Sequence, residues 1–123
     1  MISQHHIDYK AVLSLFLPKG LLEYFEITNF SDMGNYYLIS LEENNEIPES
    51  LRHLDLQSKG FYPEITITDF PARDRTVYLK IKRRRWEDKN TGKTYHRDWD
   101  LVASGTRITA EFGSFLKELL KHS

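Results

Sequence analysis

The segment from Thr76 to Trp86 constrains the fold of this chain more than any other. Alternate side chains of an extended strand point to the same face, and one face of this segment is aliphatic, formed by Val77, Leu79 and Ile81. The other face carries cations between two aromatic rings: Tyr78, Lys80, Lys82, Arg84 and Trp86. We therefore expect one long strand whose aliphatic face covers a core and whose cationic face meets solvent.

Turn residues flank this strand on both sides. Residues 71–75 form a turn after a strand at 61–70, and Gly92 within residues 88–93 can adopt a positive φ. Residues 94–102 then continue in extended form, so residues 76–99 make a basic hairpin. Its turn and returning strand add Lys89, Lys93, Tyr95, His96, Arg97 and Trp99.

The remaining segments predict two helices and another hairpin. From His5 to Leu17, apolar residues recur near helical spacing: Ile7, Ala11, Val12, Leu15 and Phe16. Residues 24–30 and 36–41 form strands around a turn, and residues 42–58 form a polar, acidic loop that could include a short helical turn. Thr109 is the expected N-cap of a closing helix at 109–122. The apolar face of that helix consists of Ile108, Phe112, Phe115, Leu116, Leu119 and Leu120.

Together these elements indicate one domain over residues 1–123, in the α+β class. It is an antiparallel β-sheet of hairpins, flanked by an N-terminal and a C-terminal amphipathic helix. We expect several aromatic residues of the N-terminal half to pack in the core and strands: Phe16, Tyr24, Phe25, Phe30, Tyr36 and Tyr37.

Charge is distributed unevenly along the chain, although its formal net charge is only −1. Residues 1–70 form an acidic half with 4 Lys and Arg against 11 Asp and Glu, whereas residues 71–99 hold 10 against 4. A block of one sign creates a local field that attracts a polyanion even when the whole protein is neutral. The basic hairpin is therefore the first place to look for a binding partner.

The residue types exclude or disfavour several kinds of site. The chain has no cysteine, so disulfides, cysteine-ligated zinc and a thiol nucleophile are impossible. The five histidines lack metal-ligand spacing, and no glycine-rich phosphate loop or nucleophile–base pair is present. We expect no enzyme activity, metal, cofactor or small-molecule ligand. Without a membrane-spanning stretch or signal-peptide pattern, a soluble cytoplasmic protein is expected.

The chemistry of the hairpin favours nucleic acid as the partner. Lysine and arginine neutralise phosphates, and tryptophan, tyrosine and arginine planes stack on bases. A two-stranded ribbon also fits the major groove of DNA. The alternative is a solvated hairpin whose cations only prevent edge-to-edge aggregation. Arg83 and Arg85 point to the other face, where they could pair with acids of the N-terminal half.

Three runs in this part of the chain resemble the N-terminal region of bacterial insertion-sequence transposases. They are the run from Ile67 to Trp86 with its Asp-Phe-Pro turn, the run Asn90-Thr-Gly-Lys-Thr-Tyr continuing to Arg97-Asp-Trp-Asp-Leu-Val-Ala, and Thr106-Arg-Ile-Thr-Ala-Glu-Phe. The similarity covers about residues 59–116.

The resemblance implies a transposition context. In larger relatives this region is a zinc ribbon that precedes a helix-turn-helix and a catalytic domain with an acidic triad. Here Glu87, Asp88 and Thr91 fall near the place of the second pair of metal ligands, and no residue matches the triad. The resemblance therefore implies a stand-alone N-terminal piece, with strand transfer encoded in a separate downstream polypeptide or in lost sequence.

The leading hypothesis is a non-catalytic accessory domain that binds the DNA ends of an insertion sequence. The residues expected to contact phosphates are Lys80, Lys82, Arg84, Lys89, Lys93 and Arg97, with Tyr78 beside them and with Trp86, Tyr95 and His96 nearer the bases. The alternative is a protein-interaction module that docks a transposase catalytic subunit. It would use the apolar face of the closing helix, with Phe115 and Leu119, or the acidic half.

Overall fold

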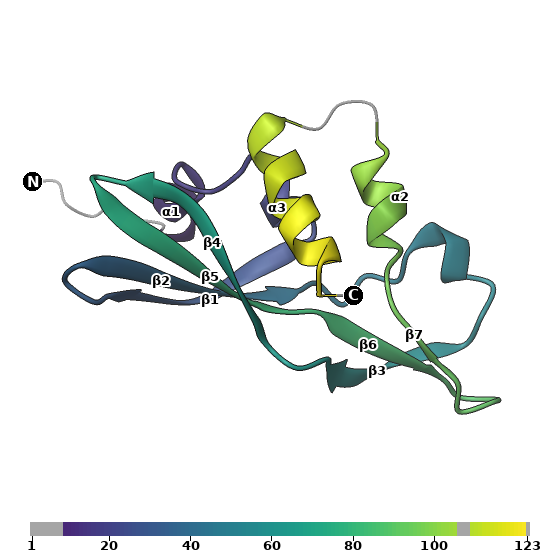
Figure 1. The fold of residues 1–123 in the computed structure, drawn as a ribbon. Coiled ribbons are helices and arrows are strands. Elements are labelled where there is room, and N and C mark those ends of the chain that lie inside the picture. Colours follow the sequence, from purple (N-terminus) through teal and green to yellow (C-terminus); the bar gives the residue numbers. More distant parts are fainter. Residues whose placement is uncertain (1–8, 106–108, 123) are drawn as a thin grey trace, which may run out of the picture.

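The computed structural model describes residues 9–105 and 109–122 of the 123-residue chain. The strands are β1 (Phe25–Asp32), β2 (Tyr36–Glu43), β3 (Leu56–Phe61), β4 (Ile65–Ala72), β5 (Arg75–Lys82), β6 (Arg84–Asp88) and β7 (Thr94–Tyr95). The helices are α1 (Tyr9–Ser14), α2 (Trp99–Ala103) and α3 (Ala110–Leu120), with short 3-10 turns η1 (Leu21–Glu23) and η2 (Glu49–Leu51). The α+β class is confirmed, and Figure 1 shows α2 and α3 side by side on one side of the sheets.

Sheet A has the strand order β1-β2-β5-β4. The predicted hairpins β1–β2 and β4–β5 are both antiparallel, whereas the central pair β2 and β5 is parallel, with Tyr37 opposite Val77. Arg73 and Asp74 join β4 to β5 with φ angles of 53° and 64°. Positive φ at both central residues matches the twist of a tight hairpin.

Sheet B has the strand order β3-β6-β7, and several elements in and around it differ from the prediction. The single strand expected at residues 76–86 divides at Arg83, so that β5 and β6 belong to different sheets. The loop expected at 42–58 contains the end of β2 and the start of β3, and the strand expected at 61–70 begins only at Ile65. Residues 94–102 are not continuously extended, because α2 begins at Trp99.

The N-cap of α2 explains that last difference. The Asp98 carboxylate accepts a hydrogen bond from the Leu101 backbone N–H at 3.1 Å, which satisfies one of the free donors of the first helical turn. The predicted cap of α3 is confirmed, because the Thr109 hydroxyl accepts from the Phe112 N–H at 3.1 Å.

The main core lies between sheet A and α3. The aliphatic face of β5 is buried as predicted, and so is the apolar face of α3 with Phe112, Phe115, Leu116 and Leu119. Phe115 and Leu119 are therefore unavailable as a docking surface, and that expectation was wrong. No helix in the described ranges is long and apolar enough to cross a membrane.

The N-terminal helix is shorter than predicted, because it ends at Ser14; His5 to Asp8 lie outside the described residues. The helical period therefore does not continue to Leu17, and a different set of side chains faces the core. Leu17 is buried, whereas Val12 and Phe16 are about half exposed and Leu15 is 80% exposed. The expectation that Phe16 packs in the core or in a strand was wrong, because it lies outside the strands and is about half exposed. Phe30 is exposed as well, but it packs within sheet A as predicted, since its ring stacks on Tyr37 with 5.7 Å between centroids.

Candidate nucleic-acid interface

Glu43, the last residue of β2, holds the two sheets and the α2 segment together. Its carboxylate is buried and accepts a hydrogen bond from the Arg84 backbone N–H at 2.9 Å and another from Arg97 Nε at 3.0 Å. Burial raises the pKa of the Glu43 carboxyl above its ordinary value, and the hydrogen bonds from Arg84 and Arg97 counteract that rise. A buried charge is tolerated only when it is paired in this way.

Arg97 is consequently a structural residue and not a phosphate ligand. Its side chain is only 13% exposed, and its Nη2 also donates to the Glu46 carbonyl at 2.9 Å. The guanidinium lies over the rings of Tyr24 and Trp99, at 5.1 and 5.8 Å from their centroids. The sequence prediction for Arg97 was wrong because its partner is 54 residues away in the chain.

The Arg84 side chain also makes its hydrogen bonds within the protein. Its guanidinium donates to the Glu43 carbonyl from Nε and Nη2, at 3.2 and 3.0 Å, and to the Ser58 hydroxyl from Nη1, at 2.8 Å. The carbon of the guanidinium lies 4.4 Å from the centroid of the Phe61 ring. Few donors of Arg84 are left for a phosphate, so its predicted role was also wrong.

Trp86 is fully buried and cannot stack on a base. Its indole Nε1 donates to the Asn45 side-chain oxygen at 2.9 Å, which satisfies the one polar atom of the ring. Arg84 and Trp86 are covered for the same reason, because the end of β2 and the segment after it, with Glu43 and Asn45, lie against this face from Arg84 onward. The alternation of faces itself was predicted correctly, since Lys82 and Arg84 both lie against Phe61.

Arg83 and Arg85 behave in the opposite way to the prediction. Instead of pairing with acids, they donate to backbone carbonyls: Arg83 Nη2 to His122 at 3.3 Å, and Arg85 Nη2 to Lys59 at 3.1 Å. Within the described ranges, no carboxylate oxygen lies within 4.0 Å of either guanidinium. Both positive charges therefore remain uncompensated by a close ion pair.

Tyr78, Lys80 and Lys82 lie where they were predicted, on the face of sheet A opposite to the aliphatic face of β5. All three are partly exposed. Lys80 Nζ is 3.8 Å from Glu64, and the Tyr78 ring packs edge-on against Tyr36 at 5.4 Å. Lys82 has no carboxylate partner within 4.0 Å among the described residues.

The turn between β6 and β7 carries the remaining predicted residues. Gly92, with φ of 73°, closes it, and its N–H donates to the Asp88 carbonyl at 2.8 Å. Lys93 is exposed and lies 5.4 Å from the Tyr95 ring, whereas Lys89 is 3.7 Å from Asp55. Because β3 pairs with the other edge of β6, the hairpin is not a free two-stranded ribbon.

His96 is exposed, and its Nδ1 lies 2.8 Å from the Arg97 carbonyl oxygen. A carbonyl only accepts hydrogen bonds, so Nδ1 carries the proton and, in the neutral ring, Nε2 is an acceptor. The His96 ring packs edge-on against Tyr62, with 6.0 Å between centroids. Arg85, which is exposed, and Tyr62, which is partly exposed, are further residues of this region that the sequence prediction did not include. The alternation along the chain gave no signal for Arg85, because it placed Arg84 and Trp86 on the solvent face.

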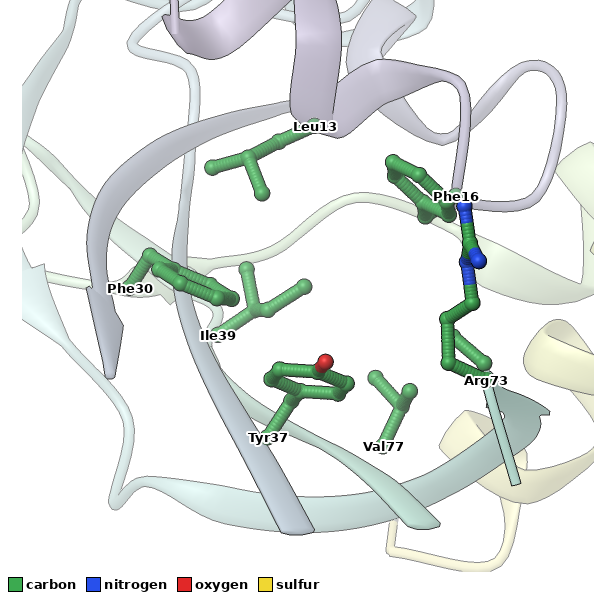
Figure 2. A pocket seen from close by; sticks show the side chains of 8 residues that line it. Leu13, Phe16, Phe30, Tyr37, Ile39, Arg73 and Val77 are labelled. Atoms are coloured by element: carbon green, nitrogen blue, oxygen red, sulfur yellow. The ribbon is translucent and has the colours of Figure 1, made fainter. Parts of the chain in front are cut away.

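A separate cavity of about 220 Å³ lies beneath α1, and its walls are almost entirely apolar. Figure 2 shows Leu13 and Phe16 above it, Phe30, Tyr37, Ile39 and Val77 around it, and Arg73 at one side. The exposed apolar side chains Val12, Leu15, Phe30 and Met33 belong to the same part of the chain, α1 and the β1–β2 hairpin. This region is chemically unlike the cationic hairpin.

Two further observations bear on the nature of the site. In the part of the chain that the structure describes, no three potential metal-ligating residues come together. The Asp88 carboxylate instead accepts the Asn90 backbone N–H at 2.9 Å and so stabilises the turn. Comparisons with protein-family models, with curated proteins and with solved structures found no match.

Proposed function

We propose that this protein is a non-catalytic DNA-binding domain whose contacts are made by a cationic hairpin surface, defined as Lys82, Arg85 and Lys93. The observation that carries the proposal is that these three cations reach solvent from one short stretch of chain. None has a carboxylate within 4.0 Å among the described residues. Cations without a close counter-charge bind phosphates without first breaking an ion pair.

The geometry favours contacts to the nucleic-acid backbone over insertion of the hairpin into a groove. Three strands side by side are broader than the two-stranded ribbon that the major groove admits. Lys82 is the last residue of β5 in sheet A, Arg85 lies in β6 of sheet B, and Lys93 lies in the turn that follows β6. Tyr95 and His96, both at least partly exposed, are the adjacent rings that would reach bases.

The biological context that we propose is insertion-sequence transposition, with the element ends as the DNA target. Its support is the resemblance of residues 59–116 to the N-terminal region of insertion-sequence transposases. The catalytic domain would be a separate chain, and this domain would recognise or hold the ends.

The proposal is tested by binding of a fluorescent DNA duplex carrying an element end to Arg85→Ala/Lys93→Ala and to a matched control, Lys19→Ala/Lys117→Ala. Both double variants remove two exposed positive charges, but the control charges lie outside the hairpin. We expect the hairpin variant to bind at least about tenfold more weakly at 0.1 M salt, and the control to bind like the parent. Equal losses in both variants, or no loss in either, would refute the cationic hairpin surface.

A second function, docking of the transposase catalytic subunit, is favoured by the apolar cavity beneath α1. Of the residues that line it, only Arg73 is charged, and no carboxylate lies within 4.0 Å of its guanidinium in the described part of the chain. The complementary occupant is an apolar side chain of the subunit that is flanked by a carboxylate. Large exposed apolar surfaces of this kind often mark protein interfaces.

Co-purification with the polypeptide encoded next to this chain tests the docking function. Phe16→Asp should abolish the complex, whereas Phe70→Asp, at an equally exposed phenylalanine that does not line the cavity, should leave it intact. A complex that survives Phe16→Asp excludes the cavity as the docking site.

A further inference from the structure

A second cavity, of about 160 Å³, lies where the two sheets and the end of α3 meet. It is lined by residues from four separate segments: Tyr62, Arg83, His96, Trp99 and His122. A water molecule occupies about 30 Å³, so the cavity has room for a small polyatomic ligand. None of the lining residues is acidic.

Two buried hydrogen-bond donors belong to side chains of this cavity and have no acceptor. They are Arg83 Nε and Trp99 Nε1, which lack a partner among the described residues. Trp99 is itself 3% exposed, and its ring is fixed by stacking on Phe25 at 5.3 Å. Leaving a buried donor unpaired is unfavourable, and both of these donors belong to side chains that line this one cavity.

The remaining polar groups of the cavity are also suited to an anion. Arg83 Nη2 donates one long hydrogen bond, 3.3 Å, to the His122 carbonyl. Arg83 has no ion-pair partner in the described ranges. The Tyr62 hydroxyl can donate, and the guanidinium of Arg83 is a planar fork of N–H donors that matches the oxygens of a phosphate.

We propose that this cavity binds a phosphate group, with Arg83 as its principal ligand and with Trp99, Tyr62 and His96 as supporting donors or walls. The inference goes beyond the proposed function, because it assigns a separate phosphate site to this cavity. Free phosphate and a phosphate of nucleic acid share the chemistry that such a site recognises. Arg83 is not part of the cationic hairpin surface, so the two proposals fail independently.

The indole resonances of the two tryptophans provide the test. Inorganic phosphate is titrated into the isotope-labelled protein at constant ionic strength, and the Nε1–H signals are followed by NMR. We expect the Trp99 signal to shift and saturate, whereas the Trp86 signal stays in place because its N–H is bonded to Asn45. An unchanged Trp99 signal at saturating phosphate would overturn the proposal.

The variant Arg83→Gln gives the matched comparison, since it keeps the size and some donors of the side chain but removes its charge. We expect at least a tenfold weaker phosphate affinity. His96→Gln, a change on an exposed residue, should weaken phosphate binding less. It provides a second test of the cavity in case Arg83→Gln impairs folding. Equal affinity in the parent and Arg83→Gln contradicts the assignment.

Two oligonucleotide arms distinguish the source of the phosphate. If the ligand is a terminal phosphate of DNA, a 5′-phosphorylated strand should shift the Trp99 signal at lower concentration than the same strand with a 5′-hydroxyl. If the ligand is an internal phosphate, both strands should compete with inorganic phosphate equally. If neither strand competes, the cavity binds free phosphate and the nucleic-acid source is excluded.

Discussion

At the scale of single residues, Glu43 determines which arginines are available to a ligand. It takes Arg97 and the backbone of Arg84 into the interior. The guanidiniums of Arg83 and Arg85, on either side of Arg84, have no carboxylate within 4.0 Å among the described residues.

Glu43→Ala should lower the free energy of unfolding by about 3–5 kcal/mol, because it leaves the Arg97 guanidinium largely buried without its counter-charge. Urea denaturation measures the change. Glu46→Ala is the matched control, since Glu46 contacts Arg97 only through its backbone carbonyl and is exposed. A loss of less than 1 kcal/mol in Glu43→Ala would contradict the structural role of the pair.

The pH dependence of stability should report on Asp69. Burial raises the pKa of the Asp69 carboxyl, and the nearby Glu111 adds to the rise, against a backbone hydrogen bond from Phe70. A carboxyl whose pKa is higher in the folded state than in the unfolded state favours folding below its unfolded pKa. That contribution is lost as the pH rises through the folded pKa.

Asp69→Asn removes this titration while it keeps an acceptor for the Phe70 N–H. The variant should therefore gain stability relative to the parent between pH 3 and pH 7, as measured by denaturant unfolding at both values. A variant that loses stability relative to the parent over this interval would show that Asp69 prefers its charged form.

At the scale of elements, local patterns predicted the structure well where local rules decide it. The alternation in β5, the β1–β2 hairpin, the Gly92 turn and the Thr109 cap were all predicted and are confirmed. The sequence could not show that the cationic face is open beside β5 but covered beside β6, because the covering segment is about 40 residues away.

The sequence prediction missed α2 for another reason, because the signal for the start of this helix is local. Asp98 is a good N-cap residue, but the extended pattern around Tyr95 favours a strand. Whether α2 or a strand follows Arg97 decides where Trp99 lies, and so whether the second cavity exists.

Asp98→Ala should cost about 1 kcal/mol of stability, because it removes the acceptor for the Leu101 N–H. Amide hydrogen exchange should show faster exchange at Leu101, with no change in α3. Asp100→Ala, at the second residue of α2, serves as the control, because the Asp100 carboxylate has no hydrogen-bond or ion-pair partner among the described residues. Unchanged exchange at Leu101 would mean that the cap does not hold α2 in place.

At the scale of the whole molecule, Arg85 and Lys93 belong to sheet B and its β6–β7 turn, whereas Lys82 ends β5 of sheet A. Figure 1 shows sheet B extending away from α1 and α3, with the β6–β7 turn at its far end. The net charge of −1 does not reveal this arrangement, because many acidic residues lie in the N-terminal half. The apolar cavity beneath α1 is in a different region, so DNA and a protein partner could bind simultaneously.

The salt dependence of DNA binding tests the cationic hairpin surface most directly. Each phosphate contact contributes about 0.9 to the slope of log K against log salt concentration. The slope for Arg85→Ala/Lys93→Ala should therefore be about 2 smaller in magnitude than that of the parent and of Lys19→Ala/Lys117→Ala. A parent that shows no salt dependence, or a hairpin variant with the parental slope, would contradict DNA binding through this surface.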